Sequence, residues 1–213
     1  MRKLFFTLIF AVLSTLLPAQ QFAGYTKRTT LYETYQPAEI TLYNGQVIQQ
    51  KEANIFLRNG RLLFKSGRHD MEANMAQVRS VRFADRHFVS IDTTLAMVVD
   101  TIGSSRILCT TTIDLEAYSQ LKINERLISN IHLEWDMINA VSSRELPDSD
   151  VQYPLISHFY VEIDGKVVKV DERTLRRMLP KDKHSRFDFY LQMPGFEWTS
   201  RESLTLILEL FED

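Results

Sequence analysis

Two Asn-Gly dipeptides constrain the fold of this chain more than any other feature of its sequence. Asn44-Gly45 and Asn59-Gly60 follow each other closely, and apolar residues flank both of them. Because Asn and Gly both tolerate a positive φ, such a dipeptide is a strong signal for a tight β-hairpin turn. The sequence therefore predicts two successive hairpins, the beginning of a β-meander.

Alternation of apolar and polar residues extends this prediction over residues 29–170. A third hairpin is predicted around Asp164-Gly165, a pair that also tolerates positive φ. Residues 114–124 fit either one helical face or two short strands, and the pattern leaves both alternatives open. Residues 142–150 are polar and predict a surface loop. The remaining predicted strands cover residues 77–83, 87–91, 94–99, 106–113 and 131–137.

The period changes from that of a strand to that of a helix at Asp171. We expect Asp171 to be an N-cap, with Val170 and Leu175 forming a hydrophobic staple around it. A second short helix is predicted over residues 182–193. Thr199 and Glu202 fit a capping box for a third helix. The apolar stripe of this last helix consists of Leu204, Ile207, Leu208 and Phe211.

Strands that precede helices indicate an α+β fold rather than a parallel α/β sheet. We expect an antiparallel, hairpin-rich body over residues 29–170, followed by two or three short helices over residues 171–213. The sequence has no linker-like stretch between these parts. Residues 20–213 are therefore predicted to form a single unit.

Residues 1–19 are typical of a secretory signal peptide. Arg2 and Lys3 provide the positive charge, and residues 4–17 provide the apolar stretch. This stretch is shorter than the roughly 20 residues that a membrane-spanning helix needs. We therefore expect export to the periplasm or the cell surface, with no stable membrane span after cleavage.

The predicted cleavage site lies between Ala19 and Gln20. Pro18 ends the apolar stretch, and Ala19 is the small residue that signal peptidase requires. A cut after Ala23 is the second possibility for processing. An uncleaved N-terminal anchor, which would make the protein a membrane-associated subunit, is the other alternative.

Four segments resemble an uncharacterised family of small exported proteins of Gram-negative bacteria. These segments are Ile40-Thr41-Leu42-Tyr43-Asn44-Gly45-Gln46-Val47-Ile48, Val78-Arg79-Ser80-Val81-Arg82-Phe83, Leu175-Arg176-Arg177-Met178-Leu179-Pro180 and residues 204–210. The resemblance implies secretion, a β-rich body and a helical C-terminus. It supplies no catalytic residues.

Charge and cysteine content exclude several classes of protein. The chain has 25 Lys and Arg against 27 Asp and Glu, a net charge of −2. This balance gives no reason to expect nucleic acid as a partner, because nucleic-acid binding requires a clustered basic surface. The single cysteine, Cys109, cannot form an intramolecular disulfide. It lies in a strand-like apolar run, so we interpret it as a buried core residue rather than a nucleophile.

Two short motifs are candidates for a chemical site. His132, Glu134 and Asp136 would lie on one side of the predicted strand 131–137 and are the best candidate metal ligands. The same alternation also predicts an ordinary solvated strand face, which is the preferred interpretation, so no metal site is predicted. Gly103-Ser104-Ser105 lacks the second glycine of a nucleophile elbow and is interpreted as a turn.

Three tyrosines near the start of the mature chain offer a further candidate surface. Tyr25, Tyr32 and Tyr35 could form a platform for a stacked ligand, or could pack at the edge of a core. We prefer the second interpretation. The neighbouring Lys27-Arg28 pair is interpreted as ordinary surface.

The sequence thus predicts no catalytic, cofactor-binding or metal-binding residues. We expect an exported, non-enzymatic accessory or interaction protein whose partner is another envelope protein. The alternative is a hydrolase of envelope or extracellular polymer, with a carboxylate site that only the fold assembles. A deep pocket with perturbed carboxyl groups would favour the hydrolase. An apolar surface patch or an open sheet edge would favour the interaction protein.

Overall fold

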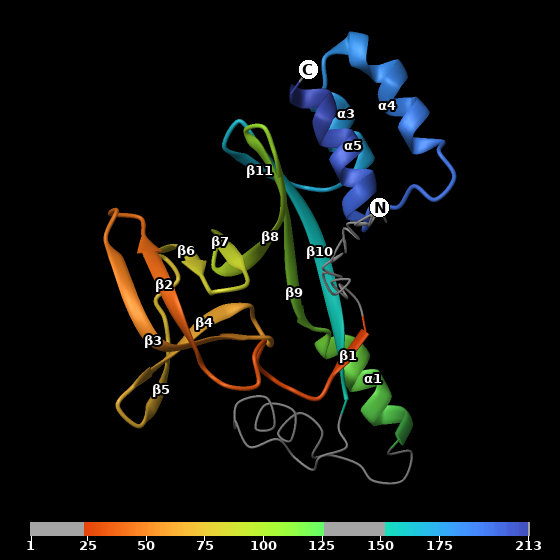
Figure 1. Ribbon diagram of the computed structural model, residues 1–213. Helices are drawn as coiled ribbons and strands as arrows, with labels where there is room; N and C mark the ends of the chain where they lie inside the picture. Colours follow the sequence, from red (N-terminus) through yellow and green to blue (C-terminus); the bar gives the residue numbers. More distant parts are fainter. Residues whose placement is uncertain (1–23, 126–151, 213) are drawn as a thin grey trace, which may run out of the picture.

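The computed structural model describes residues 24–125 and 152–212, whose strands form one 11-stranded antiparallel sheet (Figure 1). The strands are β1 (Gly24–Thr26), β2 (Gln36–Leu42), β3 (Val47–Phe56), β4 (Arg61–Ser66), β5 (His69–Glu72), β6 (Val78–Arg82), β7 (His87–Ile91), β8 (Thr94–Ile102), β9 (Ser105–Ile113), β10 (Tyr153–Ile163) and β11 (Lys166–Lys169). The helices are α1 (Leu115–Glu125), α3 (Glu172–Met178), the short 3-10 helix η1 (Lys181–Lys183), α4 (His184–Leu191) and α5 (Arg201–Glu212).

Two meanders make up the sheet. Strands β2 to β5 pair in chain order, and so do strands β6 to β10. The two meanders join where β2 lies beside β6, with Ile40 opposite Val81. At the other end of the sheet, β10 pairs with both β1 and β11. The predicted antiparallel, β-rich α+β organisation is confirmed.

The sheet curls, so that the loop between β3 and β4 reaches strands of the second meander. The backbone N–H of Leu95 in β8 donates to the carbonyl of Gly60 (2.8 Å). The N–H of Ile113 in β9 donates to the carbonyl of Leu57 (2.7 Å). Figure 1 shows β2 to β5 lying to one side of the long strands β8, β9 and β10 as a result.

All three predicted hairpins form, but their turns differ in backbone conformation. Asp164 and Gly165 both have positive φ (52° and 75°), as a two-residue turn of this type requires. In Asn44-Gly45 and Asn59-Gly60, only the glycines have positive φ (86° and 68°). The two predicted hairpins themselves are confirmed, because β2 pairs antiparallel with β3 and β3 pairs antiparallel with β4.

The Asn44-Gly45 turn is a three-residue loop that ends in a β-bulge. The N–H of Gly45 donates to the carbonyl of Leu42 (3.0 Å), and the N–H of Leu42 donates to the carbonyl of Gln46 (2.8 Å). Gly45 and Gln46 therefore share one partner on the opposite strand, and Gly45 takes the left-handed conformation that this bulge needs.

The undecided segment 114–124 is a helix. The carboxylate of Asp114 caps α1 by accepting a hydrogen bond from the N–H of Ala117 (2.9 Å). Since α1 precedes β10 in the chain, the helices are not all C-terminal. The edge strands β1 and β5 were not predicted, because β1 is very short and β5 has no regular apolar alternation. The predicted strand 131–137 and loop 142–150 lie outside the described residues.

The cap of α3 is confirmed and the cap of α5 is corrected. Asp171 accepts a hydrogen bond from the N–H of Thr174 (2.8 Å). The hydroxyl of Ser200, not Thr199, accepts from the N–H of Ser203 (3.3 Å), so the predicted cap was one residue too early. The second predicted helix, 182–193, is divided into η1 and α4.

Two large apolar clusters hold the structure together. In the helix-covered core, residues of β9 and β10 pack against α3, α4 and α5. Its buried members include Ile107, Cys109, Phe159, Leu175, Phe187, Leu204, Ile207, Leu208 and Leu210. The predicted stripe of α5 is thus confirmed at three positions, while Phe211 is only partly buried and Leu210 is buried in addition.

The second cluster, the curled core, lies inside the curl of the sheet and is formed by strands rather than helices. Its buried members include Ala38, Ile40, Ala53, Ile55, Leu62, Val78, Val81, Phe83, Phe88, Leu95 and Met97. Val99 packs against both clusters. None of the described helices is long and apolar enough to cross a membrane.

Candidate interaction surface

The helices cover only one face of strands β9 and β10. Phe159 and Cys109 lie opposite each other in the ladder, and both belong to the helix-covered core. The next residue on each strand points the other way, because side chains alternate along a strand. Leu108 and Tyr160, which also lie opposite each other, therefore belong to the reverse side of the sheet.

We call this reverse side of β6 to β11 the outer face. At its centre, Val89, Ala96 and Leu108 are buried, and half-buried Ile91, Val98 and Tyr160 pack against them. A smaller apolar cluster around α1 is formed by Leu57, Ile113, Tyr118 and Tyr153, and it lies on the opposite face, as does the helix-covered core. The other members of the outer face, from the ladder register, include Ser80, Arg82, His87, Arg106, Thr110, Ile156, His158, Glu162, Val167 and Lys169.

Cationic side chains surround the apolar centre of the outer face. Arg106 forms an ion pair with Glu162, and Lys169 lies opposite Tyr160. Partial burial lowers the pKa of His87, and the nearby Arg82 and Arg106 lower it further. The imidazole of His87 is therefore uncharged at neutral pH.

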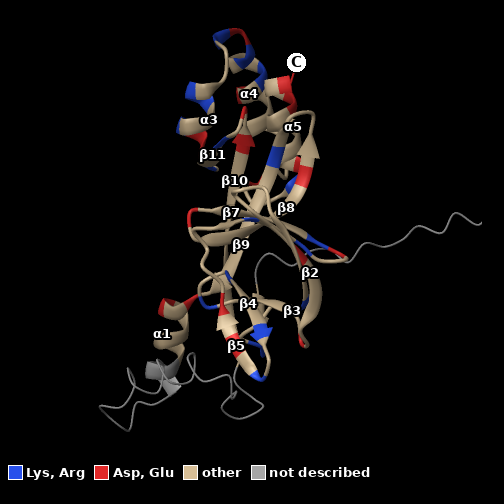
Figure 2. Ribbon diagram, turned by 90° about the vertical axis from the view of Figure 1, so that its left-hand side faces the viewer, with Lys and Arg blue, Asp and Glu red and all other residues tan. Residues whose placement is uncertain are grey.

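His158 has the same character at the β10 end of the outer face. Partial burial lowers its pKa, and the positive charge of Lys169 adds to the effect. The outer face thus combines an apolar centre with a cationic rim. In the view of Figure 2, basic and acidic residues are interspersed along the strands and helices, in keeping with the small net charge of −2.

A second open feature is the long strand β3. It pairs with β2 from Val47 onward, but it pairs with β4 only from Ala53. The side chain of Gln50 donates to the carbonyl of Lys65 (3.0 Å), where β4 diverges from β3. Among the described residues, 47–49 have no strand partner on the side away from β2, and we call this side the β3 edge. Figure 1 shows β3 at the outside of the first meander.

The β3 edge is exposed, apolar and uncharged. Tyr43, Val47 and Ile48 are 58%, 52% and 37% exposed. Residues 43–50 include no charged side chain. Sheet edges are usually guarded against pairing by charges, proline or short length. The other edge strands follow this rule, since β11 carries two lysines, β5 carries three charged or titratable residues and β1 has three residues.

Cys109 is buried, as predicted. Its Sγ lies 3.6 Å from the carbonyl oxygen of Thr110 and 3.8 Å from Oγ1 of Thr111. Burial raises the pKa of the thiol to about 11. The side chain is therefore a neutral thiol at neutral pH and lacks the thiolate character of a nucleophile.

The serines after Gly103 bind the end of α5. Ser105 donates to the carboxylate of Glu212 (2.7 Å), and the backbone N–H of Ser104 donates to its other oxygen (3.2 Å). Gly103 has a φ of 54°, and a Cβ at this position would collide with Glu212. The predicted turn is confirmed. The hydroxyl groups of Ser104 and Ser105 both donate to Glu212 and so link the end of α5 to the β8–β9 hairpin.

The three candidate tyrosines lie in different surroundings. The ring of Tyr32 packs against Phe83 with 4.9 Å between centroids, and its hydroxyl donates to Asp85 (2.6 Å). Tyr35 lies beside the ammonium group of Lys65. Tyr25 lies on β1 and is 61% exposed. Packing at a core edge is thus confirmed for Tyr32, and these contacts give the three rings no shared platform.

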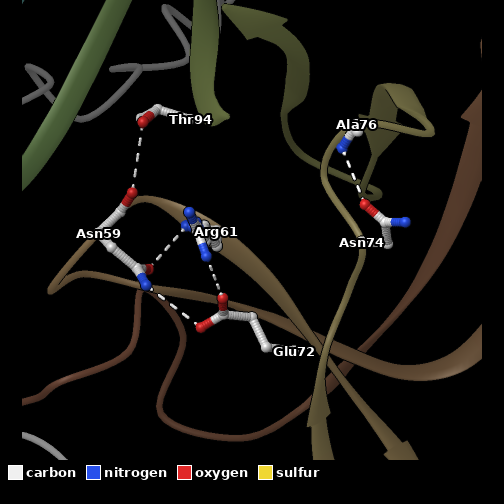
Figure 3. Close-up of polar contacts among 6 residues, drawn as sticks. All are labelled: Asn59, Arg61, Glu72, Asn74, Ala76 and Thr94. Atoms are coloured by element: carbon white, nitrogen blue, oxygen red, sulfur yellow. Dashed lines mark hydrogen bonds and ion pairs between the residues drawn. The ribbon is translucent and has the colours of Figure 1, made fainter. Parts of the chain in front are cut away.

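A polar network of Asn59, Arg61, Glu72 and Thr94 lies at the β3–β4 turn (Figure 3). The carboxylate of Glu72 accepts from Arg61 (2.6 Å) and from the amide of Asn59 (3.2 Å). Thr94 donates to the carbonyl of Asn59 (3.4 Å). The network links β4, β5 and β8, and we assign it a structural role.

Neither a metal site nor a known relative identifies the function. Within residues 24–125 and 152–212, no three His, Cys, Asp or Glu side chains are grouped so that they could hold a metal ion. The candidate ligands His132, Glu134 and Asp136 lie outside the described residues, as do the predicted signal peptide and its cleavage site. Comparisons with protein-family models, curated proteins and solved structures found no match. The resemblance to an exported family therefore stays a prediction.

Proposed function

We propose that the protein is an exported, non-enzymatic accessory protein of the periplasm or cell surface that binds another envelope protein. The observation that carries this proposal is the outer face, where half-buried apolar side chains lie on a sheet surface that the helices leave uncovered. Apolar patches with a polar rim are typical of protein-binding surfaces. Ile91, Val98 and Tyr160 would supply the apolar contacts, and Arg82 and Lys169 would favour an acidic partner.

Among the described residues, the carboxyl groups with shifted pKa values lack the raised pKa that the alternative, a hydrolase, would need. A general acid at neutral pH needs a carboxyl group with a raised pKa. Where the described carboxyl groups have shifted pKa values, the shift is downward, which favours the charged form. These groups are Glu72, Asp100, Asp171, Asp188, Glu202 and Glu212.

The proposal is tested by capture from the organism's own envelope fraction. Residues 20–213 are immobilised, and the retained proteins are compared with those retained by Ile91→Lys, which places a charge in the centre of the outer face. Ser185→Lys makes the same change on the exposed surface of α4 and is the matched control. We expect one protein to be retained stoichiometrically by the wild type and the control and to be lost with Ile91→Lys.

Folding of the variants is checked by circular dichroism before capture. Identical retained proteins for all three forms would contradict the role of the outer face. Release of soluble fragments from an envelope polymer by the purified wild type would favour the hydrolase instead.

A further inference from the structure

We infer that the β3 edge pairs with the β3 edge of a second copy of this chain, so that two sheets join across a twofold axis at Ile48. This inference goes beyond the proposed function, because it requires no other protein and uses a different surface. A free edge of this kind presents unpaired backbone N–H and C=O groups, and an extended backbone is what complements them.

The hydrogen-bonding pattern of the β2–β3 hairpin fixes which backbone groups are available. The N–H of Leu42 donates to the carbonyl of Gln46, which makes these two a hydrogen-bonded pair. Hydrogen-bonded and non-hydrogen-bonded pairs alternate along an antiparallel ladder. The backbone groups of Ile48 therefore point toward Ile40 on β2, and those of Val47 and Gln49 point away from β2.

This pattern matches itself under a twofold rotation. If the axis passes at Ile48, Val47 of each copy lies opposite Gln49 of the other copy, and both residues have outward backbone groups. The two Ile48 side chains then meet in a non-hydrogen-bonded pair, where side chains approach most closely. The aliphatic side chains that are exposed in the single chain would thus pack against each other.

The absence of charge favours a second copy as the occupant. Since residues 43–50 are uncharged, two of these edges can approach without repulsion. Self-pairing of β11 would instead bring Lys166 of one copy opposite Lys169 of the other. A pair of strands about five residues long buries less than the roughly 1,200 Å² of a stable interface, so we expect a weak dimer with a Kd on the order of 100 μM.

Cysteine crosslinking tests the register. In the Ile48→Cys variant, the two Cα atoms would be about 4.5 Å apart, within the range that a disulfide spans. In the matched control Gln50→Cys, which lies on the same side of the strand, they would be about 14 Å apart. We expect a disulfide-linked dimer from Ile48→Cys under mild oxidation, and none from Gln50→Cys or from the wild type, whose Cys109 is buried.

Sedimentation equilibrium of the wild type and of Val47→Pro tests the pairing itself. Proline removes an outward N–H that the dimer would use, so its Kd should rise about tenfold or more, while Val47→Thr keeps the N–H and should stay within about twofold. A wild type that stays monomeric up to about 1 mM, far above the expected Kd, would overturn the inference. So would equal crosslinking of both cysteine variants. A monomer that still captures an envelope protein would leave the proposed function intact.

Discussion

The helix-covered core and the curled core solve the same packing problem in different ways. In the first, helices from the end of the chain cover one face of β9 and β10. In the second, the sheet bends over itself, and hairpins of the first meander cover the strands of the second. Each solution leaves a different surface open. The described helices leave the outer face of the sheet uncovered, and in the first meander the divergence of β4 from β3 leaves the β3 edge without a strand partner among the described residues.

The two cores meet at Val99, which packs against both. Next to it, Asp100 in β8 forms an ion pair with Arg201 at the start of α5 (2.9 Å). These contacts couple the helical end to the sheet. We therefore expect the two cores to unfold together, as one cooperative unit.

Truncation of a fully buried leucine in each core should have the largest effect. Leu208 in the helix-covered core and Leu62 in the curled core are both 0% exposed. Each change to alanine should lower the free energy of unfolding by about 2–5 kcal/mol, since it removes buried methyl groups and leaves a cavity. Urea unfolding followed by far-UV circular dichroism and by tryptophan fluorescence measures this.

The two probes should report one midpoint in both variants. Separate midpoints would show that the helix-covered core and the curled core unfold independently, so that they are not parts of one cooperative unit. Glu209→Ala, on α5 next to Leu208, is the control and should change the free energy of unfolding by less than about 0.5 kcal/mol.

Replacement of a buried asparagine on β3, a strand of the curled core, should have the next largest effect. The side chain of Asn54 accepts from the N–H groups of Tyr32 (3.0 Å) and Ile55 (2.9 Å) and donates to the carbonyl of Tyr32 (2.9 Å). Asn54→Ala leaves these groups without their partner and should cost about 1–3 kcal/mol in urea unfolding. Gln49→Ala, on the exposed part of the same strand, should cost less than about 0.5 kcal/mol. Equal costs would mean that Asn54 does not hold the segment before β2 in place.

The difference between the helix-covered core and the curled core also explains which parts of the fold the sequence could predict. Alternation and turn residues are local signals, and they located β7 and β8 within a few residues. The curl depends on hydrogen bonds such as Leu95 to Gly60, between residues far apart in sequence, so it has no local signal. The run Ile107-Leu108-Cys109 is apolar on both sides of its strand, so the pattern could not show which side the helices cover.

Of the candidate surfaces, only part was visible in the sequence. The absence of charged residues just after Asn44-Gly45 is visible in the sequence and is unusual for an edge strand. Only the structure shows that β4 diverges from β3 there and leaves the edge open. The outer face is assembled from the six strands β6 to β11, and only the ladder register brings His87 and Tyr160 to the same side.

Removal of the N-cap of α5 should have a smaller effect on the helix-covered core. Ser200→Ala should lower the free energy of unfolding by about 1 kcal/mol, because its hydroxyl satisfies the N–H of Ser203 at the start of the helix. Thr199→Ala is the matched control and should change the free energy by less than about 0.5 kcal/mol. The reverse order in thermal or urea unfolding would restore Thr199 as the cap.

The smallest expected effect concerns the two histidines of the outer face, and it compares their surroundings directly. Burial and nearby cations hold the pKa values of His87 and His158 below the usual 6.5. The unfolded chain therefore binds protons that the folded chain does not, so stability should fall as the pH drops below about 6.5. Arg82→Gln removes a cation beside His87 only. In this variant, the pH at the titration midpoint of His87, followed by NMR, should rise. The midpoint of His158, which responds to Lys169, should stay unchanged. Movement of both midpoints together would mean that the two histidines share one electrostatic environment.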